Sequence, residues 1–68
     1  MEFKEKLEMI LEQRTTTKTA VANKMGMPEA TFRFKSVALK RWNVVEFDTL
    51  VKLLRLTDSE VDFLRSEG

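Results

Sequence analysis

The side chains with the most chemistry to offer are cations, and they gather in the middle of the sequence. Residues 14–41, the central segment, contain seven lysines and arginines but a single acid, Glu29, a net charge of +6. The rest of the chain contains five bases and ten acids, a net charge of −5. A cationic segment of this kind favours a polyanionic partner. The alternative interpretation is a run of solvated helix surfaces.

Catalytic chemistry has little support in the sequence. The chain contains no histidine and no cysteine, so the commonest general base, the commonest nitrogen ligand for metals and the thiolate nucleophile are all missing. It has no glycine-rich phosphate loop, and its carboxylates are spread over expected helix surfaces. We therefore expect no enzyme activity, no metal site, no cofactor and no small-molecule ligand.

The elements that must position the cations are helices. The 68 residues, with one proline and two glycines, predict a single domain over residues 1–68 with few turns. Apolar residues recur at helical spacing, which predicts an all-α fold of five helices. These helices are expected at about residues 2–14, 18–25, 28–35 or slightly beyond, 45–56 and 57–64. No apolar run has the length of a signal peptide or a membrane span, so we expect an intracellular protein with no membrane partner.

The first helix illustrates the apolar spacing. Its expected inner face carries four apolar residues, Phe3, Leu7, Ile10 and Leu11. Its expected outer face carries four charged residues, Glu5, Lys6, Glu8 and Glu12. In the fifth helix, Thr57 and Glu60 have the spacing of a capping box. Val61 and Leu64 are expected to cover the edge of the core.

A tight turn is expected between the second and third helices. Thr17 is suited to cap the start of the second helix, because its hydroxyl can accept from a free backbone N–H. Gly26 follows that helix at the position where a left-handed residue ends a helix at least cost. Pro28 fits the first turn of the next helix, and Glu29 suits the positive end of its dipole. The pattern predicts a helix-turn-helix.

The motif resembles that of the lambda-repressor-like family of Cro/repressor-type domains. Residues 20–32, "AVANKMGMPEATF", are similar to the family pattern "xLAxxLGVSxxTI". The tail "FDTLVKLLRLTDSEVDFL" resembles the family's "LETLLKLAKALGVSLDEL", so the likeness covers about residues 7–64. It implies a transcription regulator that binds double-stranded DNA as a homodimer, on an operator with an inverted repeat. It also implies a cytoplasmic location in a bacterium, with a bacterial or phage gene.

By this resemblance the third helix, about residues 28–37, enters the major groove. The implied base-reading residues are Glu29, Ala30, Arg33 and Phe34. Arg33 is the best reader, since its guanidinium matches the N7 and O6 acceptors of guanine, with a salt bridge to Glu29 as the alternative. Glu29 can accept from cytosine or simply favour the helix dipole. Ala30 can contact a thymine methyl group or serve only as spacing.

A second set of residues is expected to contact phosphates, which position a protein on DNA without reading sequence. It comprises Thr17, Lys18, Lys24, Thr31, Lys35, Lys40 and Arg41. Lys18 stands where the family often has glutamine, which favours a phosphate contact over a base contact. Thr31 has a solvated surface position as its alternative.

Three aromatic residues have more than one interpretation. Phe34 can touch DNA, join a dimer contact or pack under residues 36–42, and packing is the preferred interpretation. Trp42 is expected to pack in the core against the fourth helix. Phe63, with Leu56 beside it, is the candidate surface for a weak homodimer through the fifth helix, or else completes the core.

The sequence departs from the family pattern at the end of the third helix. Lys35 stands where family members usually have an apolar residue, so the expectation is that Ser36 or Val37 turns inward instead, or that the third helix is rotated. A second functional class also remains open, because a fold does not determine a function. It is a small helical protein-interaction module, such as an antirepressor or accessory factor.

Overall fold

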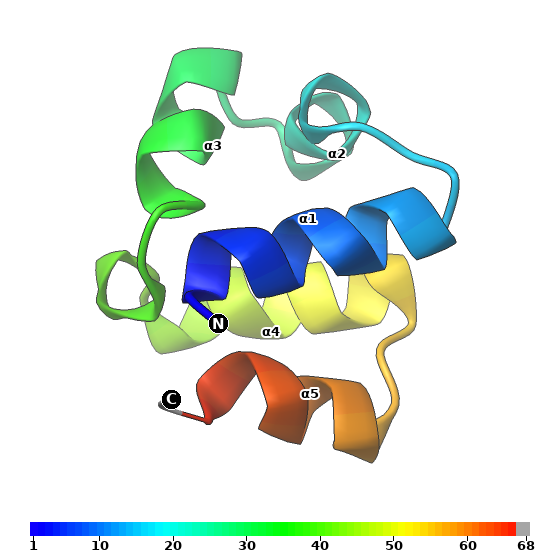
Figure 1. The fold of residues 1–68 in the computed structure, drawn as a ribbon. Helices are drawn as coiled ribbons and strands as arrows, with labels where there is room; N and C mark the ends of the chain where they lie inside the picture. The colour runs from blue at the N-terminus through cyan, green and yellow to red at the C-terminus, as the bar shows by residue number, and fades with distance from the viewer. Residues whose placement is uncertain (67–68) are drawn as a thin grey trace.

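Five α-helices and one short 3-10 helix make up the described part of the chain, residues 1–66 of a computed structural model. They are α1 (Phe3–Gln13), α2 (Lys18–Met25), α3 (Glu29–Lys35), η1 (Leu39–Arg41), α4 (Val44–Leu54) and α5 (Asp58–Arg65). In Figure 1, α2 and α3 lie at the top of the view and α5 at the bottom, with α1 and α4 between them. The predicted all-α class with five helices is confirmed, and no strand occurs within residues 1–66.

Local caps set the ends of the last two α-helices. Asn43 accepts a hydrogen bond from the Glu46 N–H, 2.7 Å away, and the Glu46 side chain accepts in return from the Asn43 N–H. This capping box begins α4 one residue earlier than predicted. Arg55, at φ 52°, ends α4 before the predicted residue 56. The predicted capping box of Thr57 and Glu60 is present at the start of α5.

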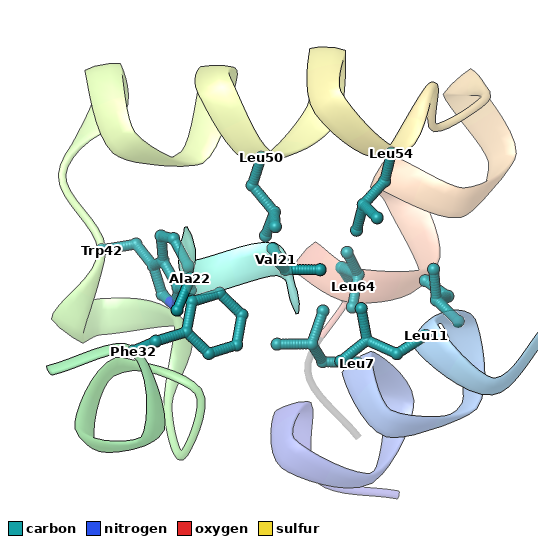
Figure 2. Close-up of a cluster of buried hydrophobic side chains, with 10 residues drawn as sticks. Leu7, Leu11, Val21, Ala22, Phe32, Trp42, Leu50, Leu54 and Leu64 are labelled. Carbon is teal, nitrogen blue, oxygen red and sulfur yellow. The ribbon is translucent and has the colours of Figure 1, made fainter. Parts of the chain in front are cut away.

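The core lies between α4 and the helices that face it. Figure 2 shows Leu50 and Leu54 of α4 pointing toward Val21 of α2, Leu7 of α1 and Leu64 of α5. The complete buried apolar set is Leu7, Ile10, Leu11, Val21, Ala22, Phe32, Trp42, Leu50, Leu54 and Leu64. Each fully buried leucine or phenylalanine contributes roughly 1.5–3 kcal/mol to the free energy of unfolding. All five α-helices therefore contribute to one shared core.

Trp42 is buried in the core, as predicted. The prediction placed it against α4, and the ring that it contacts, Phe32, belongs to α3. The Trp42 ring meets Phe32 edge-to-face, with ring centres 5.7 Å apart and an interplanar angle of 86°. Edge-to-face contact is a preferred aromatic geometry and adds to the effect of burial. The buried Trp42 Nε1 has no hydrogen-bond partner among the described residues. Trp42 thus anchors the segment after α3 to the core mainly by packing.

One prediction for α1 is wrong: Lys6 does not lie on an exposed face. Its side chain is only 4% exposed, and its Nζ donates to the Ser66 carbonyl oxygen at 2.6 Å and to Ser66 Oγ at 3.0 Å. The helical spacing of charged residues could not reveal this, because the acceptors come from the opposite end of the chain. The other three residues of the expected outer face, Glu5, Glu8 and Glu12, are exposed.

None of the helices in residues 1–66 has both the length and the apolar character needed to span a bilayer.

Candidate nucleic-acid interface

The turn between α2 and α3 follows from three local features. Thr17 Oγ1 accepts from the Ala20 N–H at 3.1 Å and caps α2. Gly26 has φ 69°, and the Met27 N–H donates to the Ala22 oxygen at 2.9 Å, the closure typical of a helix ended by a left-handed residue. Pro28 then precedes α3 as its N-cap. As a result only three residues separate the end of α2 from the start of α3, and the two helices pack against each other.

The outer face of α3 carries all four residues expected to read bases. Glu29, Ala30, Arg33 and Phe34 are exposed, and Phe32 on the opposite face is fully buried. Phe32 therefore fixes the rotation of α3 about its axis, since a quarter turn would expose a large aromatic ring. One seven-residue helix thus brings the four predicted residues together on the surface.

Glu29 and Arg33 are linked to each other and to α2. Arg33 Nε donates to Glu29 Oε2 at 2.7 Å, so the alternative interpretation of this pair, a salt bridge, is present. Thr19 Oγ1 donates to the other carboxylate oxygen, Glu29 Oε1, at 2.6 Å. The hydrogen bonds from Thr19 and then Arg33 lower the pKa of Glu29 below its usual value of 4.5. Glu29 is therefore ionised at neutral pH.

Thr19 was not predicted from the sequence. It lies ten residues before Glu29, on the first turn of α2. The only sequence signal was a hydroxyl residue two positions after the Thr17 cap. Its role depends on how closely the turn brings the starts of α2 and α3 together.

The end of α3 shows how the chain accommodates a lysine at position 35. Ser36 is buried and its Oγ donates to the Arg33 oxygen at 2.8 Å, whereas Val37 is exposed. Of the two residues proposed to turn inward, Ser36 is the one that does. Lys35 turns toward α4, where its Nζ lies 2.9 Å from Glu46 Oε1 and donates to the Arg41 oxygen at 3.1 Å.

Phe34 is not buried, so the preferred interpretation of this residue is wrong. Its side chain is 60% exposed. The Arg41 guanidinium lies over the ring, 4.1 Å from its centre, and Arg41 Nη1 donates to the Phe34 oxygen at 2.9 Å. One ring face is therefore covered by a cation from the η1 segment and the rest is open to solvent. The position of Phe34, two residues after Phe32, could not predict this contact, because the guanidinium that covers its ring comes from a residue after α3.

The residues expected to contact phosphates fall into three groups. Lys18 and Lys35 are only 15% and 19% exposed, and each forms an ion pair, with Glu8 at 2.8 Å and with Glu46 respectively. Lys24 and Lys40 are exposed, and their ammonium groups form no hydrogen bond or ion pair with another residue in the range 1–66. The other three are Thr17, which caps α2, Thr31, which is exposed on α3, and Arg41, which stacks on Phe34.

The cationic central segment is largely neutralised by the rest of the fold. Three acids from outside the segment pair with it: Glu60 with Arg14, Glu8 with Lys18 and Glu46 with Lys35. Within the segment Glu29 pairs with Arg33. The bases of the segment with no carboxylate partner in residues 1–66 are Lys24, Lys40 and Arg41. The charge separation seen along the sequence is therefore much weaker in space.

A cavity of about 340 Å³ lies away from the outer face of α3. Its lining is mainly apolar and comes from η1, α4 and α5, with Leu39, Trp42, Phe47, Val51 and Val61 as the principal residues. Asp48 and Arg65 are the charged residues in its wall. In residues 1–66 no three acidic side chains gather as a metal site would require.

Comparisons of the chain with protein families, with curated proteins and with solved structures returned no match. The likeness to lambda-repressor-like domains accordingly stays a prediction from the motif residues.

Proposed function

We propose that the protein is a sequence-specific regulator of transcription that binds double-stranded DNA with α3 in the major groove. The observation that carries this proposal is the composition of the exposed face of α3, where Arg33, Glu29 and Ala30 stand together on a short helix after a tight turn. A short helix with exposed hydrogen-bonding groups fits the major groove, which presents a distinct donor and acceptor pattern for each base pair. The motif resemblance supports the same assignment.

The backbone of the DNA is held by few charges in this proposal. Within the central segment, the cations with no carboxylate partner in residues 1–66 are Lys24, Lys40 and Arg41, and they lie in the segments before and after α3. Three phosphate contacts per protomer predict a slope of about −2.7 for the logarithm of the binding constant against the logarithm of salt concentration. A slope of about −4.5 per protomer would mean that Lys18 and Lys35 exchange their glutamates for phosphates.

Binding to random duplex libraries tests the proposal directly. We expect the recovered sequences to contain an inverted repeat, and Arg33→Ala to lose preference at one position of each half-site, at a cost of about 1–3 kcal/mol. Lys24→Ala should weaken all duplexes equally and reduce the salt slope by about one. Lys18→Ala should change the slope less, because Glu8 already neutralises its charge. Wild-type protein that fails to bind duplex DNA at low salt would refute the function.

A homodimer would supply two recognition helices, with half-sites about one helical turn apart, roughly 34 Å. We propose that it forms weakly through α5, because part of the Phe63 ring is exposed beside the buried Lys6 ammonium, 5.4 Å from the ring centre. Leu56 is partly buried against the core and contributes less than Phe63. Sedimentation over a concentration series should show association that Phe63→Glu abolishes. A wild type that stays monomeric and binds a single half-site would remove the dimer.

Val45→Glu is the matched control, since it places the same charge at an exposed apolar residue of α4. If Val45→Glu abolishes association and Phe63→Glu does not, the dimer forms through the start of α4.

A second function, docking to another protein, is favoured by one observation. Val44 and Val45, at the start of α4, are 86% and 74% exposed, which is unusual for two adjacent valines. Scattered exposed apolar residues are ordinary, but neighbouring ones mark interaction surfaces more often. Binding of duplex DNA that depends on salt separates the two functions, because a protein-docking module shows no such dependence.

A further inference from the structure

The link between Thr19, Glu29 and Arg33 uses both oxygens of the carboxylate. Glu29 Oε1 accepts from the Thr19 hydroxyl at 2.6 Å, and Glu29 Oε2 accepts from Arg33 Nε at 2.7 Å. An ionised carboxylate is an acceptor only. Both oxygens are already engaged by protein donors, one of which comes from α2 and the other from the next turn of α3. Glu29 is thus placed to hold a neighbour rather than to contact a base.

The hydrogen bond that Nε donates to Glu29 leaves the far end of the Arg33 side chain open. A guanidinium has five N–H donors in a rigid fork, and Nε contributes one of them. The two terminal amino groups, Nη1 and Nη2, form no hydrogen bond with any residue in the range 1–66, and the side chain is 56% exposed. The remaining donors include the parallel pair that fits the N7 and O6 acceptors of guanine end-on.

We propose that Glu29 is a positioning residue, which with Thr19 fixes the guanidinium of Arg33 so that its terminal amino groups read one guanine in each half-site. This inference rests on the DNA-binding function proposed above. It reassigns Glu29, which the sequence suggested as a reader of cytosine. A long arginine side chain that is held before binding loses less freedom when it meets the base.

The negative charge of Glu29 adds a second effect on specificity. Its carboxylate stands on the face of α3 that would meet the DNA, where it repels phosphates whatever the sequence. At a site with guanine, the hydrogen bonds from the Arg33 guanidinium to the base offset this repulsion. At a site without guanine these hydrogen bonds are not made, and the repulsion remains. Glu29 therefore lowers affinity for non-specific DNA and raises discrimination.

The test compares two duplexes that differ at one base pair. At this position, selection from random duplexes gives a guanine preference with wild-type protein and no preference with Arg33→Ala. Wild-type protein should prefer guanine at this position by about tenfold or more. Glu29→Ala should reduce the preference to about threefold or less and bind non-specific duplex as tightly as wild type or more tightly. Thr19→Val, which removes the hydroxyl and keeps the shape, should give an intermediate preference. Arg33→Lys should abolish the preference while retaining the charge.

Asp48→Ala is the matched control. Asp48 and Lys52 form another exposed acid–base pair four residues apart, with 3.0 Å between the charged atoms, on α4. Asp48→Ala changes the net charge by the same amount as Glu29→Ala, but at a position outside the proposed interface. It should leave the guanine preference unchanged, which separates positioning from a general effect of charge.

A measurement on the free protein completes the test. In wild type the Arg33 Nε–H should exchange slowly with solvent in a nuclear magnetic resonance spectrum, and it should exchange faster in Glu29→Ala and in Thr19→Val. Glu29→Ala protein that keeps the full guanine preference, or weakens specific and non-specific duplexes equally, would overturn the positioning role and leave DNA binding intact. Wild-type protein that binds no duplex would overturn both the inference and the proposed function.

Discussion

Lys6 shows how much a single buried charge contributes to joining the two ends of the chain. Its ammonium lies where α5 ends, and it donates to two oxygens of Ser66 while the Phe63 ring lies beside it. A cation at the C-terminal end of a helix is favoured by the helix dipole and satisfies carbonyl groups that have no helical partner. The methylene stem of Lys6 is buried together with its ammonium, since the residue is only 4% exposed.

We expect Lys6→Met to lower the free energy of unfolding by about 1–3 kcal/mol, because the apolar stem is kept but the hydrogen bonds from a charged donor to Ser66 are lost. Lys6→Glu should be worse, since it places an anion at the negative end of α5. Lys4→Met and Lys4→Glu, at an exposed position of the same helix, should each change it by less than about 0.5 kcal/mol. Urea denaturation of the four variants is the measurement. Equal effects at positions 4 and 6 would contradict the burial of Lys6.

At the scale of elements, the contact of α2 with its neighbours depends on a small residue. Ala22 is fully buried, with Phe32 of α3 and Trp42 near it in the core cluster (Figure 2). Gly26, in the left-handed region, then lets the chain turn directly into α3. Because both features act on the same turn, they determine where the outer face of α3 points.

Ala22→Leu should destabilise the domain by about 1–3 kcal/mol, since the added side chain has no space where the helices pack. For a domain of this size the melting temperature should fall by several degrees, roughly 4–8 °C for each kcal/mol. Ala30→Leu makes the same change on the exposed face of α3 and is the control for stability. Thermal unfolding followed by circular dichroism measures both. An unchanged melting temperature in Ala22→Leu would show that α2 does not pack closely at this residue.

At the scale of the whole molecule, ion pairs connect elements that are distant in sequence. Arg14, at the end of α1, donates to the Leu54 oxygen at 2.8 Å and to Glu60 Oε2 at 2.7 Å, and so connects α1 with α4 and α5. The pair of Lys18 with Glu8 connects α2 with α1, and the pair of Lys35 with Glu46 connects α3 with α4. Exposed pairs of this kind contribute little individually, and a set that spans the fold contributes more.

These pairs predict a loss of stability in acid. Hydrogen bonds from Lys18, Lys35 and Arg14 respectively are the largest causes that lower the pKa values of Glu8, Glu46 and Glu60 below 4.5. Because the folded-state pKa values are depressed, their contribution to stability is fully present above about pH 4.5. It should be lost as the pH falls from there through the lowered folded-state values.

Denaturation at a series of pH values measures this loss. Replacing all three glutamates with glutamine should make the free energy of unfolding depend less on pH in the acid range. Glu12→Gln is the control, because Glu12 is exposed and forms no ion pair within residues 1–66. If the free energy of unfolding of the triple variant falls as steeply in acid as that of wild type, other carboxylates cause the loss.

The helices and their caps were determined by the sequence alone, because each depends on residues within one or two turns. Thr17, Gly26 and Thr57 fix three helix ends through hydrogen bonds or a backbone conformation that involve only near neighbours. The spacing of Leu7, Val21, Phe32 and Leu50 determined which faces are buried, since apolar area removed from water is the main favourable term in folding. α4 starts one residue earlier than predicted, because the prediction did not include Asn43 as its N-cap.

The tertiary structure alone decided which charged and aromatic side chains remain available on the surface. Lys18, Lys35 and Arg14 meet their glutamates, Lys6 meets Ser66 and Arg41 covers Phe34 only after the helices have packed. Thr19 reaches Glu29 for the same reason. A count of charges along the sequence treats every lysine and arginine as unpaired. Whether each one pairs with a carboxylate depends on distances of a few ångströms between residues on different helices. The candidate surface therefore consists of Arg33 held by Glu29, together with Lys24, Lys40 and Arg41, rather than the whole cationic segment.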